Sequence, residues 1–284
     1  MSHGPTYYPS QGRCIYCGAT DLQLSDEHIV PFSLGGQHVL KGASCLPCAD
    51  VTKRFEQDVA RSMWGEARAA FGERSRRKKA RPSHIRMVAP ETGAQGLDIP
   101  TPEFPAGMVF YKMGLPGALI GLPESVDTSP LWQLVMTGDH QRWMKFKERH
   151  GWGPVLKFQH EPVSFGRLLA KIGYCQALSE LELGDFEATC LPYIMGQRAN
   201  VSHIVGGTLK MAPARPGLSY ELGTSLIGTQ EKALVVAAVR LYANLGTPAY
   251  RVVVGEVSGR CEVRRVGSKI APENVYVEPR SDQV

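Results

Sequence analysis

The sequence predicts an α+β protein in which a small metal-stapled module precedes a larger mixed domain. Two Cys-x-x-Cys pairs, "CIYC" and "CLPC", lie close together near the N-terminus. Between Val51 and Phe71 an apolar residue recurs about every four positions, which is typical of one face of a helix. In the second half, β-branched runs alternate with segments of helical spacing, the pattern of a mixed α+β domain.

These patterns divide the chain into four segments. We expect a flexible tail over residues 1–12, the metal-centred module with a basic helix extension over 13–81, a Pro-rich linker over 82–106, and an α+β domain over 107–284. The last domain is expected to contain strands in "MVFYKM", "WQLVMTG" and "VLKFQ", helices in "DHQRWMKFKERHG" and Ser164–Gly184, and a hairpin from "KALVVAAVRLYA" and "YRVVVGEV". No residue of this domain indicates a chemical role.

Length and charge narrow the class of protein. A chain of 284 residues can form one or two domains, and its net charge of +5 resides wholly in residues 1–90, which hold 13 Lys and Arg against 8 Asp and Glu. We therefore expect a polyanion to contact the N-terminal part. No apolar run approaches the roughly 20 residues of a membrane helix, and the N-terminus lacks the apolar core of a secretory signal, so a cytoplasmic protein is expected.

The two cysteine pairs predict a structural zinc site. Thiolates suit Zn²⁺, which takes four ligands in a tetrahedron, and each Cys-x-x-Cys supplies two of them from a tight turn. The ligands are Cys14, Cys17, Cys45 and Cys48; a redox dithiol is the alternative interpretation. Four thiolates leave no open position for a substrate, so this metal would stabilise the fold. The 27 residues between the pairs leave room for an inserted hairpin.

That insertion contains "SDEHIVPFSLGG", in which Glu27 and His28 stand side by side. A neutral imidazole near pH 7 can take a proton from water, and a carboxylate can hold a hard cation such as Mg²⁺. Phosphodiester hydrolysis needs both an activated water and positive charge beside the phosphate. Because neighbours in a regular strand face opposite sides, the two side chains converge only where the backbone is irregular.

A second carboxylate ligand is expected from the helix that follows Cys48. Asp50, in its first turn, is the first choice for a catalytic Mg²⁺ or Mn²⁺ held together with Glu27. Glu56 lies nearly two turns further along the helix and is a possible ligand or a residue that orients His28.

The order "CIYCG…DEHIVPFSLGG…ASCLPC…FE" resembles the HNH endonucleases, whose ββα-metal unit is often stapled by a four-cysteine zinc. The resemblance spans about residues 13–71 and implies that His28 is the general base and Glu27 a metal ligand. The residue after the second cysteine pair would usually be Asn or His; here it is Ala49, so the helix ligand shifts to Asp50 or is absent. The middle Asn of the family name is also missing, and Gln37 or His38 is left to orient His28.

Basic residues follow the reactive hairpin along the helix and beyond it. Taken alone such a run is a solvated tail, but beside a nuclease-like helix it is expected to neutralise phosphates without reading sequence. The residues expected to contact nucleic acid are Lys53, Arg54, Arg61, Arg74, Arg76, Arg77, Lys78, Lys79 and Arg81.

The leading hypothesis is therefore a metal-dependent endonuclease that cuts DNA, with RNA left open. His28 would deprotonate the attacking water, and the products would carry a 5′-phosphate and a 3′-hydroxyl. A zinc-stabilised nucleic-acid-binding or adaptor module that has lost cleavage is the alternative, favoured by Ala49 and the missing Asn. An enzyme whose reaction lies in the C-terminal half is a third option, without a nucleophile constellation or phosphate loop to support it.

Overall fold

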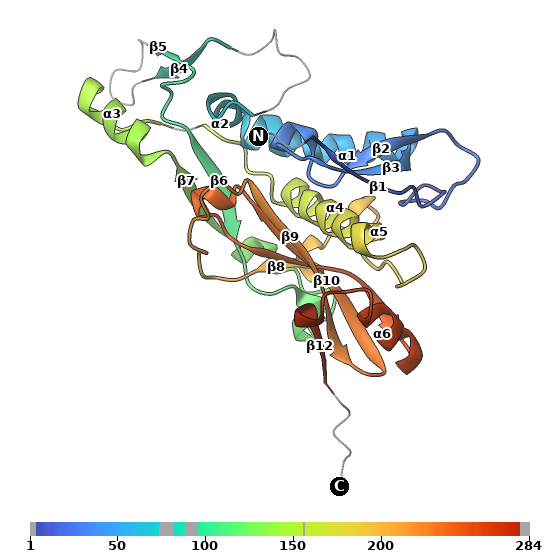
Figure 1. The fold of residues 1–284 in the computed structure, drawn as a ribbon. Helices are drawn as coiled ribbons and strands as arrows, with labels where there is room; N and C mark the ends of the chain where they lie inside the picture. Colours follow the sequence, from blue (N-terminus) through green and yellow to red (C-terminus); the bar gives the residue numbers. More distant parts are fainter. Residues whose placement is uncertain (1–3, 74–81, 89–95, 156, 279–284) are drawn as a thin grey trace.

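The computed structural model describes residues 4–73, 82–88, 96–155 and 157–278. It is a mixed helix and sheet protein, which confirms the predicted fold class. Figure 1 shows the N-terminal module on one side of the long helix α4 (Pro162–Glu180) and the largest sheet on the other. Consistent with this arrangement, α4 contacts helix α1 (Leu46–Gln57) of the module as well as strands of that sheet. Within the described residues, no helix combines the length and the hydropathy that crossing a bilayer requires.

The N-terminal module is a small sheet followed by an interrupted helix. Its strands are β1 (Thr6–Tyr8), β2 (Leu24–His28) and β3 (His38–Cys45), in the order β1-β3-β2. The predicted helix over Val51–Phe71 begins earlier than expected, because Pro47 in the second cysteine pair already stands in the first turn of α1. It continues through the π-helical segment η2 (Asp58–Met63) and α2 (Gly65–Ala70), ending one residue before the predicted end at Phe71.

The expectation of a loose tail over residues 1–12 is corrected by strand β1. Thr6, Tyr7 and Tyr8 pair in parallel with His38–Leu40 of β3. The Tyr8 hydroxyl lies 2.8 Å from His38 Nδ1, with the two rings stacked, and Lys41 lies over the Tyr7 ring. Two aromatic side chains therefore anchor a segment whose prolines and glycines predicted disorder.

The expected Pro-rich linker also contains regular structure. Strands β4 (His84–Val88) and β5 (Gly96–Pro100) pair antiparallel. Ile85 and Met87 are buried while His84 and Arg86 are exposed, and this period-two alternation is the signal of a half-buried strand. The structure therefore has a hairpin where the prolines led us to expect a linker.

The remaining part combines a strand pair, a five-stranded sheet and four helices of regular geometry. Its strands are β6 (Gly107–Lys112), β7 (Gln133–Gly138), β8 (Val205–Gly207), β9 (Tyr220–Thr229), β10 (Lys232–Leu241), β11 (Tyr250–Ser258) and β12 (Val275–Glu278). Its helices besides α4 are α3 (His140–His150), α5 (Leu191–Ile194) and α6 (Arg260–Gly267). Short 3₁₀ turns occur at η1 (Phe32–Leu34) in the module and at η4 (Gly117–Ile120), η5 (Ser129–Leu131), η6 (Val201–His203), η7 (Ala243–Leu245) and η8 (Pro272–Asn274).

Most predicted elements of this part are confirmed, and one strand is wrong. β6, β7, α3, α4 and the β10–β11 hairpin match the segments that the sequence indicated, and the large sheet has the order β12-β9-β10-β11-β8. The strand expected in "VLKFQ" is absent from its described residues, Val155 and 157–159. That segment instead runs along the module's helix, where the Gln159 amide donates to the Ser62 carbonyl at 3.0 Å.

Buried side chains form one hydrophobic cluster that includes residues of both the module and the C-terminal part. Trp64, 1% exposed, packs against Phe110, Phe165 and Tyr242, with ring centroids 5.0–5.9 Å apart. Its indole nitrogen donates to the Val109 carbonyl at 2.7 Å. The boundaries at residues 81 and 107 stay a prediction.

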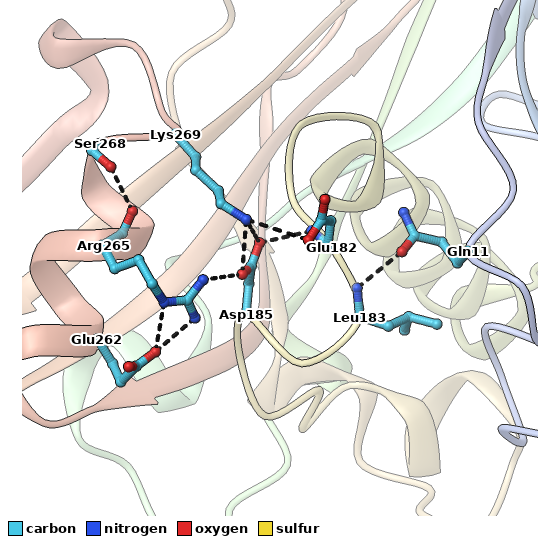
Figure 2. Close-up of polar contacts among 8 residues, drawn as sticks. All are labelled: Gln11, Glu182, Leu183, Asp185, Glu262, Arg265, Ser268 and Lys269. Atoms are coloured by element: carbon cyan, nitrogen blue, oxygen red, sulfur yellow. Dashed lines mark hydrogen bonds and ion pairs between the residues drawn. The ribbon is translucent and has the colours of Figure 1, made fainter.

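A buried carboxylate joins the loop after α4 to helix α6. Asp185, whose side chain is 4% exposed, accepts hydrogen bonds from Arg265, Lys269 and the Glu182 amide, as Figure 2 shows. Burial by itself would raise the pKa of Asp185, but these donors outweigh it and hold the pKa below its ordinary value.

We expect Asp185→Asn to lower the free energy of unfolding at pH 7 by about 1–3 kcal/mol, because hydrogen bonds to a charged group are lost. A lowered folded pKa stabilises the protein above the unfolded pKa of about 3.9 and ceases to do so as the pH falls through the folded pKa. Urea unfolding at pH 7 and pH 3 measures both effects. The loss of unfolding free energy in Asp185→Asn should be smaller at pH 3 than at pH 7. Asp98→Asn, at an exposed residue, is the control and should change the free energy of unfolding little at either pH. A loss in Asp185→Asn that is as large at pH 3 as at pH 7 contradicts the ionic explanation.

Candidate functional site

The four paired cysteines converge at one end of the module. The Sγ atoms of Cys14, Cys17, Cys45 and Cys48 all lie within 4.8 Å of one another. Cys45 ends β3 and Cys48 stands in the first turn of α1, so the strand-to-helix junction sets one pair against the other. The predicted cluster is confirmed, and it could hold a metal such as zinc.

Backbone donors around Cys14 favour a thiolate, whereas burial raises the pKa of Cys45 and Cys48. The Cys45 amide donates to Cys14 Sγ at 3.4 Å. Burial raises the pKa of Cys14, but the amides of Cys45, Cys17 and Tyr16 lower it to about 7. Because metal-ligating cysteines must be deprotonated, backbone donors aimed at a sulfur favour the metal-bound form.

The insertion between the cysteine pairs is the predicted hairpin. β2 and β3 pair antiparallel, but the register shifts between Ser25 and Glu27, so that three residues of β3 lie opposite Asp26. Asp26 accepts from the Gly42 amide at 3.0 Å and from Lys41 Nζ at 2.7 Å, which holds this bulge. The irregularity lies before Glu27, whereas Glu27 and His28 pair in regular register with Leu40 and Val39.

The glycine pair closes the turn after His28. Gly35 has φ +85°, a conformation that favours glycine. A Cβ on Gly36 would lie 1.7 Å from the Val30 carbonyl oxygen, so no larger residue fits there without moving the backbone. Arg68 of α2 donates to the Ser33 carbonyl at 2.9 Å and to the Ala60 carbonyl at 2.7 Å, which ties the turn to the helix.

A pocket of about 510 Å³ opens between the hairpin and the helix. Its lining combines the end of β2, the turn that follows it and one side of α1 and η2. The residues that line it are Ser25, Asp26, Glu27, His28, Pro31, Phe32, Ser33, Ala49, Thr52, Lys53, Glu56, Gln57, Ala60, Arg61 and Arg68. His28 is half-buried in this wall, with the Phe32 ring 5.6 Å from its own. An imidazole, carboxylates and cationic side chains thus share one concave surface.

The C-terminal part contributes a cation beneath this pocket. Lys171 of α4 is 0% exposed, and its Nζ lies 2.7 Å from Glu27 Oε1 and 3.0 Å from Glu56 Oε1. Nζ also donates to the His28 carbonyl, with the Ile29 carbonyl at 3.4 Å. Burial alone would lower the pKa of Lys171, but the charges of Glu27 and Glu56 raise it above its ordinary value. The lysine is therefore an ammonium ion at neutral pH.

The structure brings together some of the predicted site residues and leaves others apart. Glu27, His28 and Glu56 meet at the pocket, but Asp50 lies exposed on α1 and is not among the described residues that line it. His38, a candidate to orient His28, contacts Tyr8 and Tyr220 instead. Glu27 lines the pocket and is paired with Lys171, whereas Asp50 is not among its described lining residues, so a catalytic ion held by these two carboxylates stays a prediction.

Of the residues predicted to contact nucleic acid, some line the pocket and others do not. Lys53 and Arg61 line the pocket, whereas Arg54 is exposed elsewhere on α1. The basic run lies outside the described residues: Arg74, Arg76, Arg77, Lys78, Lys79 and Arg81.

Lys171 was missed by the sequence analysis, although a signal existed. Its helical neighbours Leu168, Tyr174 and Cys175 mark a buried face, and all three are fully buried. A lysine on such a face is almost never buried unless it is paired, so it indicated carboxylates elsewhere in the chain. Only the tertiary structure identifies these carboxylates as those of Glu27 and Glu56.

Comparison with known proteins gives one match. Residues 14–64 match the family model described as HNH endonuclease. The match contains the four cysteines, the hairpin, the glycine pair and most of the helix, and it ends at Trp64. No curated protein and no solved structure matched the chain. Residues 14–64 are therefore similar to the HNH endonucleases.

Proposed function

We propose that this protein is an endonuclease that hydrolyses phosphodiester bonds of DNA in the pocket of its HNH domain. The observation that carries the proposal is the position of His28, whose half-buried ring lines the pocket together with Lys53 and Arg61 inside the matched region. One side of the pocket offers a base and the other offers cations, the two groups that phosphodiester hydrolysis needs.

In the proposed reaction, His28 takes a proton from the attacking water. A neutral imidazole can accept a proton from water. The water oxygen bonds to phosphorus, the bond to the 3′-oxygen breaks, and the leaving 3′-oxygen takes a proton from solvent, which leaves a 5′-phosphate and a 3′-hydroxyl. Lys53 and Arg61 are placed to stabilise the negative charge that develops on the phosphate.

The HNH resemblance implies Mg²⁺ or Mn²⁺ for catalysis. Since Glu27 is paired with Lys171 and Asp50 is not among the described residues that line the pocket, we assign no step of the reaction to this ion. Zn²⁺ at the four cysteines would stabilise the fold and take no part in hydrolysis.

The DNA backbone would be held by basic side chains on either side of the pocket. Lys53, Arg54 and Arg61 lie on the module's helix, and the run from Arg74 to Arg81 continues it in sequence. Helix α3 adds to this surface, because Arg142 donates to the carbonyl of Ala70 at the end of α2 and exposed lysines follow on the same helix. Contacts of this kind make affinity fall steeply with salt.

A plasmid assay tests the proposed function. Wild-type protein should convert supercoiled DNA to the nicked form, in buffers with Mg²⁺, with Mn²⁺ or with no added divalent ion. His28→Ala should reduce the rate by about 10²–10⁴-fold, the usual contribution of a general base. His84→Ala is the matched control, since His84 is exposed and lies outside the described lining of the pocket. Nicking that persists in His28→Ala at the wild-type rate contradicts the assigned base.

A second candidate is a nucleic-acid-binding or adaptor module that does not cleave. The observation that favours it is the ammonium of Lys171 against Glu27, together with Ala49 in the pocket wall where a ligand would be expected. Salt-sensitive DNA binding with no nicking in any of the three buffers would select this candidate.

A further inference from the structure

The buried ammonium of Lys171 has an unusual set of partners. Four oxygen atoms surround it: carboxylate oxygens of Glu27 and Glu56, and the carbonyl oxygens of His28 and Ile29. Carboxylate and carbonyl oxygens are the ligands that proteins present to hard cations such as Ca²⁺ and Mg²⁺. The hairpin and helix of the HNH domain thus form an oxygen-lined cation site, and a side chain from α4 fills it.

The position of this site is set by long-range packing. Lys171 belongs to α4, more than a hundred residues after the matched HNH region, and α4 is buried between α1 and the five-stranded sheet. A buried ammonium needs charged partners, and Lys171 Nζ has them in carboxylate oxygens of Glu27 at 2.7 Å and Glu56 at 3.0 Å. The cation is therefore a fixed part of the fold.

We propose that Lys171 is a positioning residue whose ammonium takes the place of a divalent cation at Glu27. The C-terminal part of the chain thereby completes the pocket of the HNH domain. The proposal concerns the same pocket as the proposed function and holds whether or not the pocket cleaves DNA.

The proposal assigns two tasks to the ammonium. It neutralises the buried charge of Glu27 and Glu56, which would otherwise repel each other across the hairpin–helix junction. It also holds the carbonyls at the end of β2, where the strand stops before Pro31, and so fixes the backbone of the proposed base His28. Glu27 is then a partner of Lys171 and not a ligand of a catalytic ion.

Manganese binding to the zinc-loaded, full-length protein tests this assignment directly. Free Mn²⁺ is measured by electron paramagnetic resonance during titration of wild type, Glu27→Gln, Lys171→Met and Lys171→Met/Glu27→Gln. Wild type and Glu27→Gln should bind Mn²⁺ equally, because Glu27 holds no divalent ion. Folded Lys171→Met should gain a binding site that the added Glu27→Gln removes. Wild-type binding that disappears in Glu27→Gln, or a folded Lys171→Met that gains no site, overturns the proposal.

Thermal unfolding provides a second test, which remains informative if Lys171→Met folds poorly. Lys171→Met removes the cation that lies against the carboxylates of Glu27 and Glu56 and should lower Tm by on the order of 10 °C or prevent folding. Adding Glu27→Gln and Glu56→Gln removes the charge and should restore most of the loss. Lys210→Met, at an exposed lysine, is the matched control and should leave Tm unchanged. A triple variant no more stable than Lys171→Met contradicts the charge-neutralising role.

These results are independent of the plasmid assay. A protein that fails to nick DNA can still show the expected manganese and stability results. That outcome would contradict the proposed nuclease activity and support the role of Lys171. Conversely, nicking that depends on His28 together with Glu27-dependent Mn²⁺ binding in wild type supports the nuclease and removes the role of Lys171.

Discussion

Replacing Cys45 with serine is expected to unfold the N-terminal module at room temperature. Cys45 is 1% exposed, and its sulfur meets those of Cys14, Cys17 and Cys48. Structural zinc contributes about 10–16 kcal/mol to the folding of small zinc domains, which is comparable to the whole stability of a typical protein of about 5–15 kcal/mol. Loss of one of the four thiolates removes most of the free energy that zinc binding contributes to folding. It also leaves the hydroxyl of the introduced serine buried without a metal partner.

Metal analysis and circular dichroism measure this effect. The wild-type protein should contain one zinc per chain and unfold at a lower temperature after chelation, whereas Cys45→Ser should contain little zinc and lose helical signal. The control is Cys261→Ser, because Cys261 is exposed and lies outside the cluster. A zinc-free Cys45→Ser protein with wild-type Tm would show that the four cysteines do not staple the fold.

Trp64→Ala is expected to have the second-largest effect. Removing a fully buried aromatic side chain costs about 3–5 kcal/mol, because the transfer free energy is lost and a cavity remains. Trp64 also donates to the Val109 carbonyl, so its loss leaves a buried acceptor without this donor. Its ring joins η2 of the module to β6, α4 and the end of β10, and the variant therefore loosens the module from the C-terminal part.

Urea unfolding of three tryptophan variants separates these contributions. Trp64→Phe keeps most of the apolar bulk but loses the indole N–H, so it should be less destabilised than Trp64→Ala. Trp143→Ala, at a half-buried tryptophan of α3, is the control and should cost less than Trp64→Ala. Equal losses for Trp64→Ala and Trp143→Ala would contradict a core shared by the two parts of the chain.

The packing around Trp64 also involves the helix that carries Lys171. Trp64 lies against Phe165, in the same helix that carries Lys171 six residues later. A helix held this firmly by aromatic contacts positions its lysine within hydrogen-bonding distance of Glu27 and Glu56. The C-terminal part, which has no chemical signature of its own, thus contributes to the site through one side chain.

Local sequence patterns determined a large part of this protein. The spacing of Cys14, Cys17, Cys45 and Cys48 indicated the metal cluster, and the length between the two pairs indicated an inserted hairpin. The spacing of apolar residues and the positions of turn residues likewise indicated the module's helix, α3, α4 and the β10–β11 hairpin. These elements depend on interactions between residues close in sequence.

Only the tertiary structure decided what surrounds the reactive hairpin. It placed Asp50 on the exposed side of α1, brought Glu56 to the pocket and set Lys171 against Glu27 across more than 140 residues of chain. It also paired β1 with β3 and β4 with β5 where the sequence indicated a tail and a linker. Contacts between distant segments depend on how whole elements pack, and a charged residue does not reveal its partner from its own neighbours.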